Sequence, residues 1–322
     1  MVSLIQEASG RIFPYVWHTP LVRSEPLSRP GRGKVWLKLE SLQPTGAFKV
    51  RPAFNAILTH LEQARRAGVV TSSSGNFAQA TAYAARELGV DAQIVMMRGA
   101  SPFKIERTRQ FGGDVVLCED TFESRWETTF RIQRESGRLL LHPYDSEETI
   151  AGDGTIGIEL LEDLESDFCV VVPVSGGGLV AGIAAAVKAF RPACRVIGVQ
   201  PEANPSMAES KRQGSRVTVP ALGSMADALS VLTPGELTFE IVRELVDDVV
   251  LVEEDEFAAA VRLLAEEQKL VAEPGGAAAV AAWMAGKVDN RGLDVVCIVS
   301  GGNIVPAKFA GLLQQADMAI AG

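Results

Sequence analysis

The sequence predicts an α/β protein with doubly wound, mainly parallel sheets, and two observations point to this class. Apolar, strand-like runs alternate with helix-like patterns along most of the 322 residues, as in chains whose parallel strands are joined by helices. Some strand-like runs, such as residues 169–172 (Cys-Val-Val-Val), are apolar at every position, which is typical of strands buried on both faces. We therefore expect helices on both faces of each sheet.

Strands are expected at the short apolar runs, and helices at the longer patterns between them. The predicted strands are residues 35–39, 68–72, 91–97, 114–118, 168–174, 195–199, 249–252 and 295–299. The predicted helices are residues 52–67, 78–88, 102–111, 122–136, 152–164, 178–190, 237–245, 254–268, 276–285 and 307–318. No internal repeat, low-complexity segment or clear linker divides the chain.

Charge and hydropathy argue against some kinds of partner. The formal net charge is −9, from 31 basic and 40 acidic residues, and no run rich in Lys or Arg occurs. Neither a nucleic-acid partner nor a membrane partner is therefore expected. The longest uncharged stretch, residues 168–187, is long enough to span a bilayer. Because Pro173 and the glycines at 176–178 interrupt it, we interpret it as a strand, a loop and a buried helix.

The cysteines indicate a reducing compartment. Cys118, Cys169, Cys194 and Cys297 form no CxxC pair, and three of them lie in or beside apolar strand-like runs. We interpret those three as small buried hydrophobic residues. The first residues lack the pattern of a secretory signal peptide, so we expect a cytoplasmic protein. With three histidines in the chain, a histidine-based metal site is not expected.

Candidate functional residues gather in one lysine segment and three loops. Lys49 stands in a segment that otherwise builds apolar core, and a lysine amine can condense with a carbonyl. Loops rich in Gly, Ser and Asn begin at Ser73, Ser175 and Ser300, each after a predicted strand. Glycine loops that open onto helices present backbone N–H groups to phosphate. Ligands of parallel sheets bind at the carboxyl ends of strands, so one cleft is expected to bind a phosphorylated aldehyde cofactor.

In order and content these motifs resemble the fold type II pyridoxal-phosphate (PLP) enzymes, whose fold is like that of tryptophan synthase β. Within that group they resemble the serine/threonine dehydratase (threonine ammonia-lyase) and serine racemase branch, from about Thr19 to Val305. The resemblance implies PLP as cofactor, a homodimer and two doubly wound domains. The larger, PLP-binding domain would comprise residues 1–67 and 146–322, and the smaller one residues 68–145.

The resemblance also implies roles for individual residues. Lys49 would hold PLP covalently and take the substrate Cα proton, with Ser74 as a second acid/base group on the opposite side of the cofactor. The implied cofactor contacts are Phe48, Lys49, Asn76, Ser175, Gly176, Gly177, Gly178, Leu179, Glu273 and Ser300. The implied substrate contacts are Ser73, Ser74, Gly75, Asn76, Phe77 and Arg125.

Taken alone, each motif has another interpretation. The glycine loop loosely fits the spacing of an NAD-binding loop, and either Ser74 or Asn76 suits the N-cap of the following helix. Arg125 suits a solvated helix face. Many members of the family have His where Phe77 stands, and this departure adds an apolar wall.

No metal site is expected. Members of the family bind Mg²⁺ or Ca²⁺ through acidic residues after the strand at 195–199, whereas this chain has Gln200 and Ser206 at the corresponding places. Hard divalent cations prefer carboxylate ligands.

The predicted function is PLP-dependent β-elimination from a β-hydroxy-α-amino acid such as threonine, serine, hydroxyaspartate or phenylserine. The products would be a 2-oxo acid and ammonia. An amino-acid racemase that uses Ser74 remains an alternative, as does a β-replacement enzyme of the cysteine synthase type. A catalytically silent sensor or an NAD-binding module is the alternative from another class.

Overall fold

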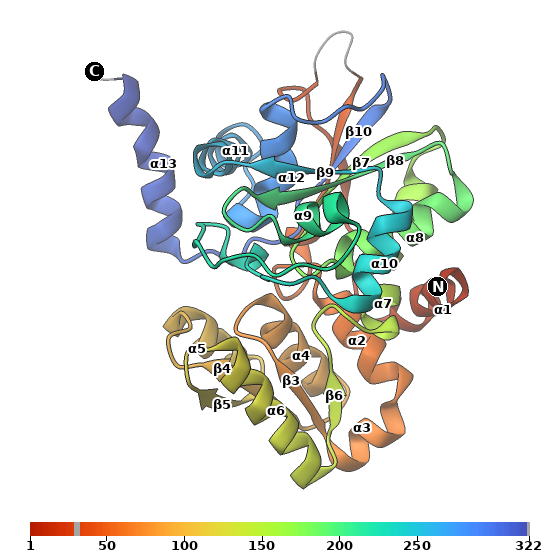
Figure 1. Ribbon diagram of the computed structural model, residues 1–322, viewed down its shortest axis with the longest axis vertical. Coiled ribbons are helices and arrows are strands. Elements are labelled where there is room, and N and C mark those ends of the chain that lie inside the picture. Colours follow the sequence, from red (N-terminus) through yellow and green to blue (C-terminus); the bar gives the residue numbers. More distant parts are fainter. Residues whose placement is uncertain (29–32, 321–322) are drawn as a thin grey trace.

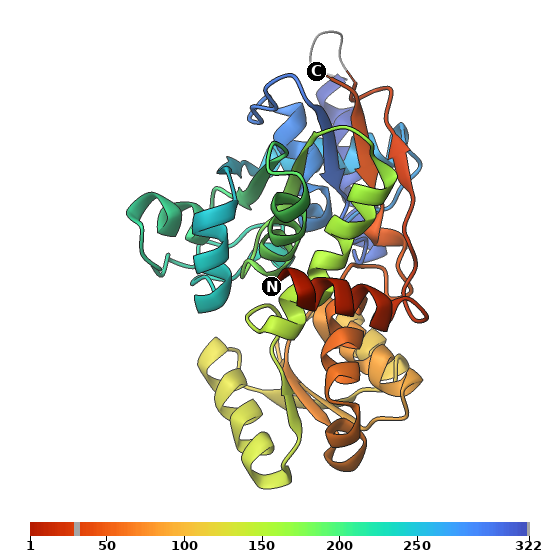
Figure 2. The ribbon, with the colours of Figure 1, turned by 90° about the vertical axis from the view of Figure 1, so that its right-hand side faces the viewer.

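The computed structural model describes residues 1–28 and 33–320. In this part of the chain the strands form two sheets, and helices cover both (Figures 1 and 2). The larger sheet has the strand order β1-β2-β10-β7-β8-β9, and the smaller one has the order β5-β4-β3-β6. The strands are β1 (Leu21–Arg23), β2 (Val35–Lys38), β3 (Val69–Ser72), β4 (Ala92–Met97), β5 (Asp114–Cys118), β6 (Leu139–Leu141), β7 (Phe168–Pro173), β8 (Arg195–Pro201), β9 (Asp248–Val252) and β10 (Asp294–Ile298).

Neighbouring strands run parallel, apart from the antiparallel pair of β1 and β2. The α/β class with mainly parallel sheets is therefore confirmed.

The helices are α1 (Val2–Ile12), η1 (Glu40–Leu42), α2 (Val50–Thr59), α3 (Leu61–Ala67), α4 (Asn76–Glu87), α5 (Pro102–Gln110), α6 (Phe122–Ser136), α7 (Glu147–Asp163), α8 (Gly178–Phe190), α9 (Ser206–Gln213), η2 (Asp227–Leu229), α10 (Glu236–Leu245), α11 (Glu254–Glu266), α12 (Pro274–Met284) and α13 (Pro306–Ile320), where η marks a 3₁₀ helix.

The predicted strands and most predicted helices are present, with ends that differ by a few residues. The single helix predicted over residues 52–67 is wrong, because the chain leaves the helical conformation at His60 (φ −123°) and forms α2 and α3. The sequence analysis missed β1, β6, α1 and α9. The two missed strands have three residues each, which is too short to show a periodic pattern.

The larger sheet is buried on both faces, as its apolar strands predict. Along β7, Cys169 and Val171 pack into the core beneath α11 and α12. Val170 and Val172, which alternate with them, pack into the core on the side of α8 and α10. The interpretation of residues 168–187 as a strand, a loop and a buried helix is confirmed by β7 and α8. No helix in the described part of the chain has both the length and the apolar character needed to cross a bilayer.

The smaller sheet has its own core, to which α2 also contributes. Val50, Phe54 and Ile57 of α2 pack in one cluster with Val69 of β3 and Ile94 of β4. The division between residues 67 and 68 stays a prediction, and α2 and α3 lie beside the smaller sheet in Figures 1 and 2.

All four cysteines are buried and unpaired. Cys169 and Cys297 lie on neighbouring strands of the larger sheet, and Cys118 ends β5 in the smaller one. The interpretation of these three as buried hydrophobic residues is confirmed.

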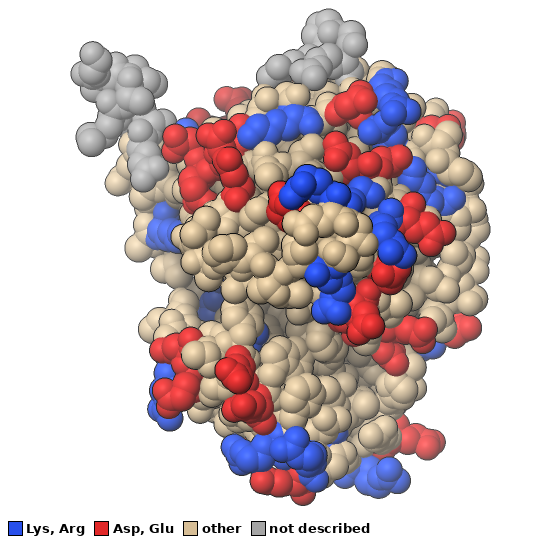
Figure 3. Space-filling model, viewed as in Figure 1, with Lys and Arg blue, Asp and Glu red and all other residues tan. Residues whose placement is uncertain are grey.

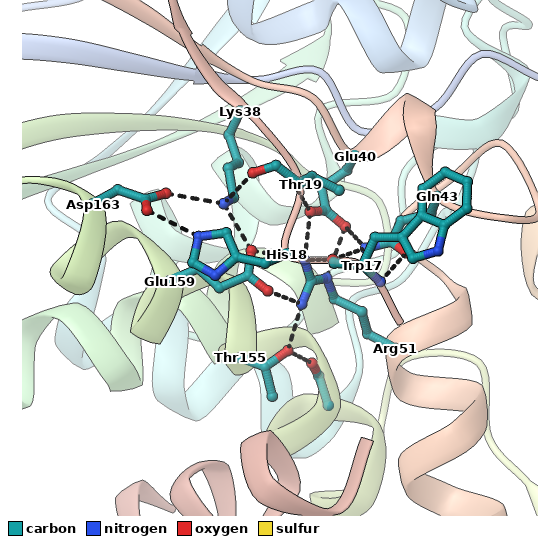
Figure 4. A network of polar contacts seen from close by, with 11 residues as sticks. Trp17, His18, Thr19, Lys38, Glu40, Gln43, Arg51, Thr155, Glu159 and Asp163 are labelled. Atoms are coloured by element: carbon teal, nitrogen blue, oxygen red, sulfur yellow. Dashed lines mark hydrogen bonds and ion pairs between the residues drawn. The ribbon is translucent and has the colours of Figure 1, made fainter. Parts of the chain in front are cut away.

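A buried network of charged side chains joins η1, α2 and α7 (Figure 4). The Arg51 guanidinium lies 2.8 Å from a Glu40 oxygen and 2.6 Å from a Glu159 oxygen. Lys38 lies 2.7 Å from Glu159, and Thr19 donates a hydrogen bond to Glu40. Burial opposes the charge on Arg51, but the two carboxylates outweigh it and raise the Arg51 pKa. Arg51 therefore holds these segments together in the charged form.

We predict that Arg51→Ala lowers the free energy of unfolding by about 3–5 kcal/mol, because it leaves buried carboxylates without their cation. Urea denaturation followed by circular dichroism measures the change. Arg66→Ala, at an exposed position in α3, is the control and should change the stability by no more than about 0.5 kcal/mol. Equal stabilities for the two variants would contradict the role given to the network.

Candidate active site

One cavity of about 350 Å³ collects the residues singled out in the sequence. Its wall includes residues next to both sheets, from α4, α5 and α6 on one side and from α8 and η2 on the other. Figure 3 shows the molecule hollowed between its larger and smaller halves, with acidic and basic side chains intermingled on the surrounding surface. The predicted site residues in the wall are Phe48, Lys49, Ser73, Ser74, Gly75, Asn76, Phe77, Arg125, Ser175, Gly176, Gly177, Gly178, Leu179, Glu273 and Ser300.

The Lys49 amine lies in an environment that favours its neutral form. It donates a hydrogen bond to the Pro143 carbonyl oxygen at 2.6 Å. The ring centroids of Phe48 and Phe77 lie 4.8 and 5.5 Å from Lys49 Nζ. Burial lowers the pKa of Lys49 from its usual value, and the charge of Asp153 opposes this only in part. A neutral amine is the form that attacks a carbonyl or accepts a proton.

The Ser300 loop fixes the backbone that carries Lys49. Phe48 N donates to Ser300 O at 3.0 Å, and Gly302 N donates to Gly46 O at 2.8 Å. Gly46 has φ +73°, and a Cβ there would lie 2.7 Å from Asn303 Oδ1. These contacts bring the loop after β10 against the lysine segment, although about 250 residues separate them in sequence.

The loop at residues 175–178 leaves β7 and opens α8. Gly177 has φ +104°, in the left-handed region that favours glycine. A Cβ on Gly176 would lie 2.4 Å from the Tyr144 ring. Thr238 Oγ1 donates to Gly176 O at 2.7 Å and holds the loop in place. Only glycine therefore fits, and the backbone N–H groups at the start of α8 remain open to the cavity.

The loop at residues 73–77 opens α4. Ser74 Oγ accepts hydrogen bonds from Met97 N at 3.1 Å and from Arg125 Nη1 at 3.4 Å. Gly75 is the N-cap of α4, and no side chain caps this end. The alternative interpretation of Ser74 or Asn76 as the N-cap is therefore wrong.

Asn76 connects the loop at residues 73–77 to Glu273 and to the Ser300 loop. Its amide nitrogen donates to Glu273 Oε1, and its amide oxygen accepts from Asn303 at 2.9 Å. Burial raises the pKa of Glu273 to about 7, although the charge of Lys104 acts in the opposite direction. The protonated form of Glu273 is thus favoured relative to that of an exposed glutamate.

Arg125 does not lie on a solvated helix face, so that alternative is also wrong. Its Nε donates to Ser72 Oγ at 2.8 Å, and its guanidinium stacks over Phe122 at 4.9 Å from the ring centroid. Both contacts hold the guanidinium at the cavity wall. Burial lowers the pKa of Arg125 from its usual value.

Sequence reasoning missed several side chains in the wall, among them Tyr144, Lys104 and Asp227. Tyr144 follows β6 at its carboxyl end, so recognising that short strand would have drawn attention to it. Lys104 of α5 forms a 2.6 Å ion pair with Asp227 of η2, across the cavity from one half of the molecule to the other. No pattern in the sequence around either residue predicts this ion pair.

Gln200 and Ser206, which suggested the absence of a metal, are engaged with each other and with α9. Gln200 Oε1 accepts from Met207 N and Ala208 N at 2.8 and 3.0 Å, and its amide nitrogen donates to Ser206. Among the side chains that the structure describes, those of residues 1–28 and 33–314, no cluster of three or more His, Cys, Asp or Glu residues has the arrangement of a metal site. The absence of a metal stays a prediction.

The residues present fit PLP by their chemistry. The Lys49 amine, with its lowered pKa, suits an aldehyde, and the glycine cradle at residues 176–178, closed to any Cβ by its neighbours, suits a phosphate. Phe48, Asn76 and Ser300 lie in the same wall and can contact an aromatic ring.

Comparison with known proteins gives a consistent result. The family model described as "Pyridoxal-phosphate dependent enzyme" matches residues 12–301. The chain is 44% identical to an L-threonine ammonia-lyase of Thermotoga maritima over 94% of its own length and 76% of the relative's. It is 43% identical to the L-threonine dehydratase catabolic TdcB of Escherichia coli K12, over 97% and 96%.

Solved structures are similar over almost the whole chain. A serine racemase of maize shares 36% identity with a TM-score of 0.92, covering 100% of this chain and 99% of that one. The processed form of threonine deaminase isoform 2 from Solanum lycopersicum shares 32% identity with a TM-score of 0.90, covering 98% and 87%.

We predict that borohydride reduction of the protein loaded with PLP fixes the cofactor to Lys49, as peptide mapping by mass spectrometry would show. Lys49→Ala should lose both this label and the visible absorbance while keeping its circular dichroism spectrum. Lys104 also lines the cavity, so it is the internal comparison. A label on Lys104 in the unmodified protein would contradict the role given to Lys49.

Proposed function

The chain belongs to the pyridoxal-phosphate-dependent enzyme family, and we propose that it is an L-threonine ammonia-lyase. It is a lyase that acts on a β-hydroxy-α-amino acid and releases a 2-oxo acid and ammonia. Its similarity to threonine ammonia-lyases over most of its length supports threonine as the substrate. The observation that carries the proposal is the half-buried Lys49 amine in a cavity that two helix N-termini also line.

The two helix N-termini suit the two anions that the reaction brings together. The N-terminus of α8, with the glycines before it, suits the cofactor phosphate, and that of α4 suits the substrate carboxylate. At the start of α4, Gly75 N donates to Ser73 Oγ at 3.3 Å, which leaves the Ser73 O–H as a donor, and Asn76 is the first helical residue. A carboxylate held there would have its Cα between α4 and Lys49.

Lys49 is the base of the proposed mechanism. When bound, PLP withdraws electrons and so stabilises the negative charge that remains at Cα after its proton is removed. Lys49 Nζ takes that proton, and its lowered pKa increases the neutral fraction that can do so. The Cα–H bonding pair then forms the new double bond as the Cα–β-carbon bond order rises and the β-carbon–oxygen bond breaks. The β-hydroxyl leaves as water with the proton that Lys49 Nζ took up, and the amine returns to its neutral form. The resulting enamine reacts with water to give 2-oxobutanoate and ammonia.

Phe77 supports threonine over an acidic substrate. Its buried ring lies 5.5 Å from the Lys49 amine and offers an apolar wall to a methyl group. Arg125 is the basic residue that would favour a second carboxylate, but it is engaged with Ser72 and Ser74. We therefore propose that Arg125 orients the Ser74 loop around the substrate.

The test is a substrate panel with detection of the 2-oxo acid product. L-Threonine should give the highest kcat/KM, with L-serine turned over more slowly and D-threonine and hydroxyaspartate slowest. Release of ammonia should match that of 2-oxobutanoate one to one. A preference for hydroxyaspartate, or no 2-oxo acid from any member of the panel, would contradict the proposal.

Racemisation is a second candidate, and the geometry of Ser74 favours it. Ser74 Oγ accepts two hydrogen bonds, from Met97 and Arg125. This leaves its own O–H as a donor at the cavity wall, where it could return a proton to Cα from the side opposite Lys49.

We predict that Ser74→Ala lowers racemisation far more than dehydration, by about a hundred- to ten-thousand-fold where racemisation occurs. Elimination needs Lys49 and a leaving hydroxyl, whereas inversion needs a second proton donor. Exchange of Cα hydrogen with solvent deuterium, with inversion, is compared with 2-oxo acid formation. Ser73→Ala is the neighbouring comparison. An equal loss of both reactions in Ser74→Ala would mean that Ser74 only positions the substrate.

We further predict that EDTA leaves the threonine turnover almost unchanged, because Gln200 and Ser206 occupy the places of metal-binding carboxylates and bond to α9 instead. The rate is compared before and after chelation and again after Mg²⁺ is added. Loss of activity that Mg²⁺ restores would show a metal requirement.

We also propose a homodimer in the cytoplasm. The family resemblance supports the dimer, and the exposed Phe13 and Trp17 offer apolar surface near the N-terminus. Four unpaired thiols support a reducing compartment. Light scattering during gel filtration should give twice the mass of one chain.

A further inference from the structure

Asp153 is a buried acid for which the proposed mechanism has no role. It lies on α7 and has no exposed surface. Among the atoms that the structure describes, neither of its carboxyl oxygens has a hydrogen-bond partner. Its Oδ2 lies 2.9 Å from the position that a Cβ on Gly178 would occupy. The carboxyl group therefore stands directly against the glycine loop, and Asp153 is not one of the residues that line the cavity.

The charged groups that face Asp153 come from the segments packed against α7. They are Lys49, at the start of α2, together with Arg51 of α2 and Glu40 of η1. Arg51 is already bonded to Glu40 and Glu159, and Lys49 donates to the Pro143 carbonyl oxygen. No cation among these is committed to Asp153.

Such a site disfavours the ionised form of the acid. Burial raises the pKa of Asp153 to about 7, against the attraction of Lys49, and Glu40 adds to the increase. Near neutral pH the group therefore changes readily between its two charge states. A phosphate dianion on the other side of Gly178 would disfavour the carboxylate further, because like charges repel strongly where water is excluded.

We propose that Asp153 is the proton-accepting residue of the phosphate subsite, and that phosphate binds to the glycine loop only while Asp153 is neutral. Where Asp153 is ionised beforehand, occupation of the loop takes up one proton from solvent, which the carboxylate accepts on an oxygen. The proposal rests on the placement of the cofactor phosphate at residues 175–179 described above. Asp153 is a positioning residue, since it acts on the phosphate through the backbone of Gly178.

The sign of the pH dependence follows from this linkage. Below the pKa of Asp153 the group is already protonated, so binding needs no proton. Above that pKa each binding event must first protonate the carboxylate, and the affinity should fall by up to about tenfold per pH unit. The dependence should vanish when the side chain cannot ionise.

Isothermal titration calorimetry with pyridoxine 5′-phosphate tests the proposal. This probe carries the phosphate but no aldehyde, so it cannot condense with Lys49. Titrations of the cofactor-free protein at pH 8, in buffers with different ionisation enthalpies, give the number of protons taken up. We expect about one proton for the unmodified protein. We expect close to none for Asp153→Asn, which should also bind several-fold more tightly at that pH.

Glu147→Gln, at an exposed position of the same helix, is the matched control and should behave like the unmodified protein. Pyridoxine, which lacks the phosphate, should bind without proton uptake. Uptake that persists in Asp153→Asn would assign the proton to another group, such as Lys49, and would overturn the proposal. So would the absence of uptake in the unmodified protein.

A second measurement does not depend on the folding of the variant. In the unmodified protein at pH 8, addition of pyridoxine 5′-phosphate should produce the infrared carbonyl band of a protonated carboxyl group, which ¹³C labelling of aspartate shifts. Absence of this band would also overturn the proposal. Threonine turnover by the holoenzyme is measured separately. If the holoenzyme turns over threonine but binding takes up no proton, the role proposed for Asp153 is wrong and the proposed function stands. If binding takes up a proton but threonine is not turned over, the proposed function is wrong and the role of Asp153 stands.

Discussion

The buried guanidinium of Arg51 is the constraint on which the arrangement of the active site depends. A cation with almost no exposed surface requires carboxylates around it, and here Glu40 and Glu159 supply them from η1 and α7. Segments far apart in the sequence are thereby joined (Figure 4). Lys49 precedes Arg51 by two positions, so the network also fixes the point at which the lysine side chain leaves the backbone. The same α7 brings Asp153 against Gly178.

Much of the site could be predicted from sequence because its chemistry is local. Ser73, Ser175 and Ser300 each follow an apolar strand. The strands before Ser175 and Ser300 belong to the larger sheet and end at one edge of it, whereas Ser73 follows β3 of the smaller sheet, whose carboxyl end faces the same cavity. The glycine content of these loops reflects a steric demand of the folded chain, as the Tyr144 ring against Gly176 illustrates. The alternation of strand and helix likewise comes from burial on both faces of the sheets, which β7 shows residue by residue.

What could not be predicted depends on contacts between distant residues. The ion pair of Lys104 with Asp227 joins residues that are 123 positions apart. Asp153 looks like an ordinary helix residue in sequence, and its charge state depends on the removal of water and on the absence of a committed cation, which only the packed structure shows. The break at His60 was missed for a different, local reason, because helical residues lie on both sides of it.

Because all four cysteine thiols are buried, the chain is suitable for site-specific labelling at introduced cysteines. Thiols enclosed in apolar surroundings react slowly with alkylating reagents, so cysteines introduced on the surface would react first. One at Arg131 of α6 and another at Glu266 of α11, both exposed positions, would carry a fluorophore pair across the hollow between the two sheets. Energy transfer between the dyes would then report how far the halves of the molecule approach one another during a catalytic cycle, without removal of any native cysteine.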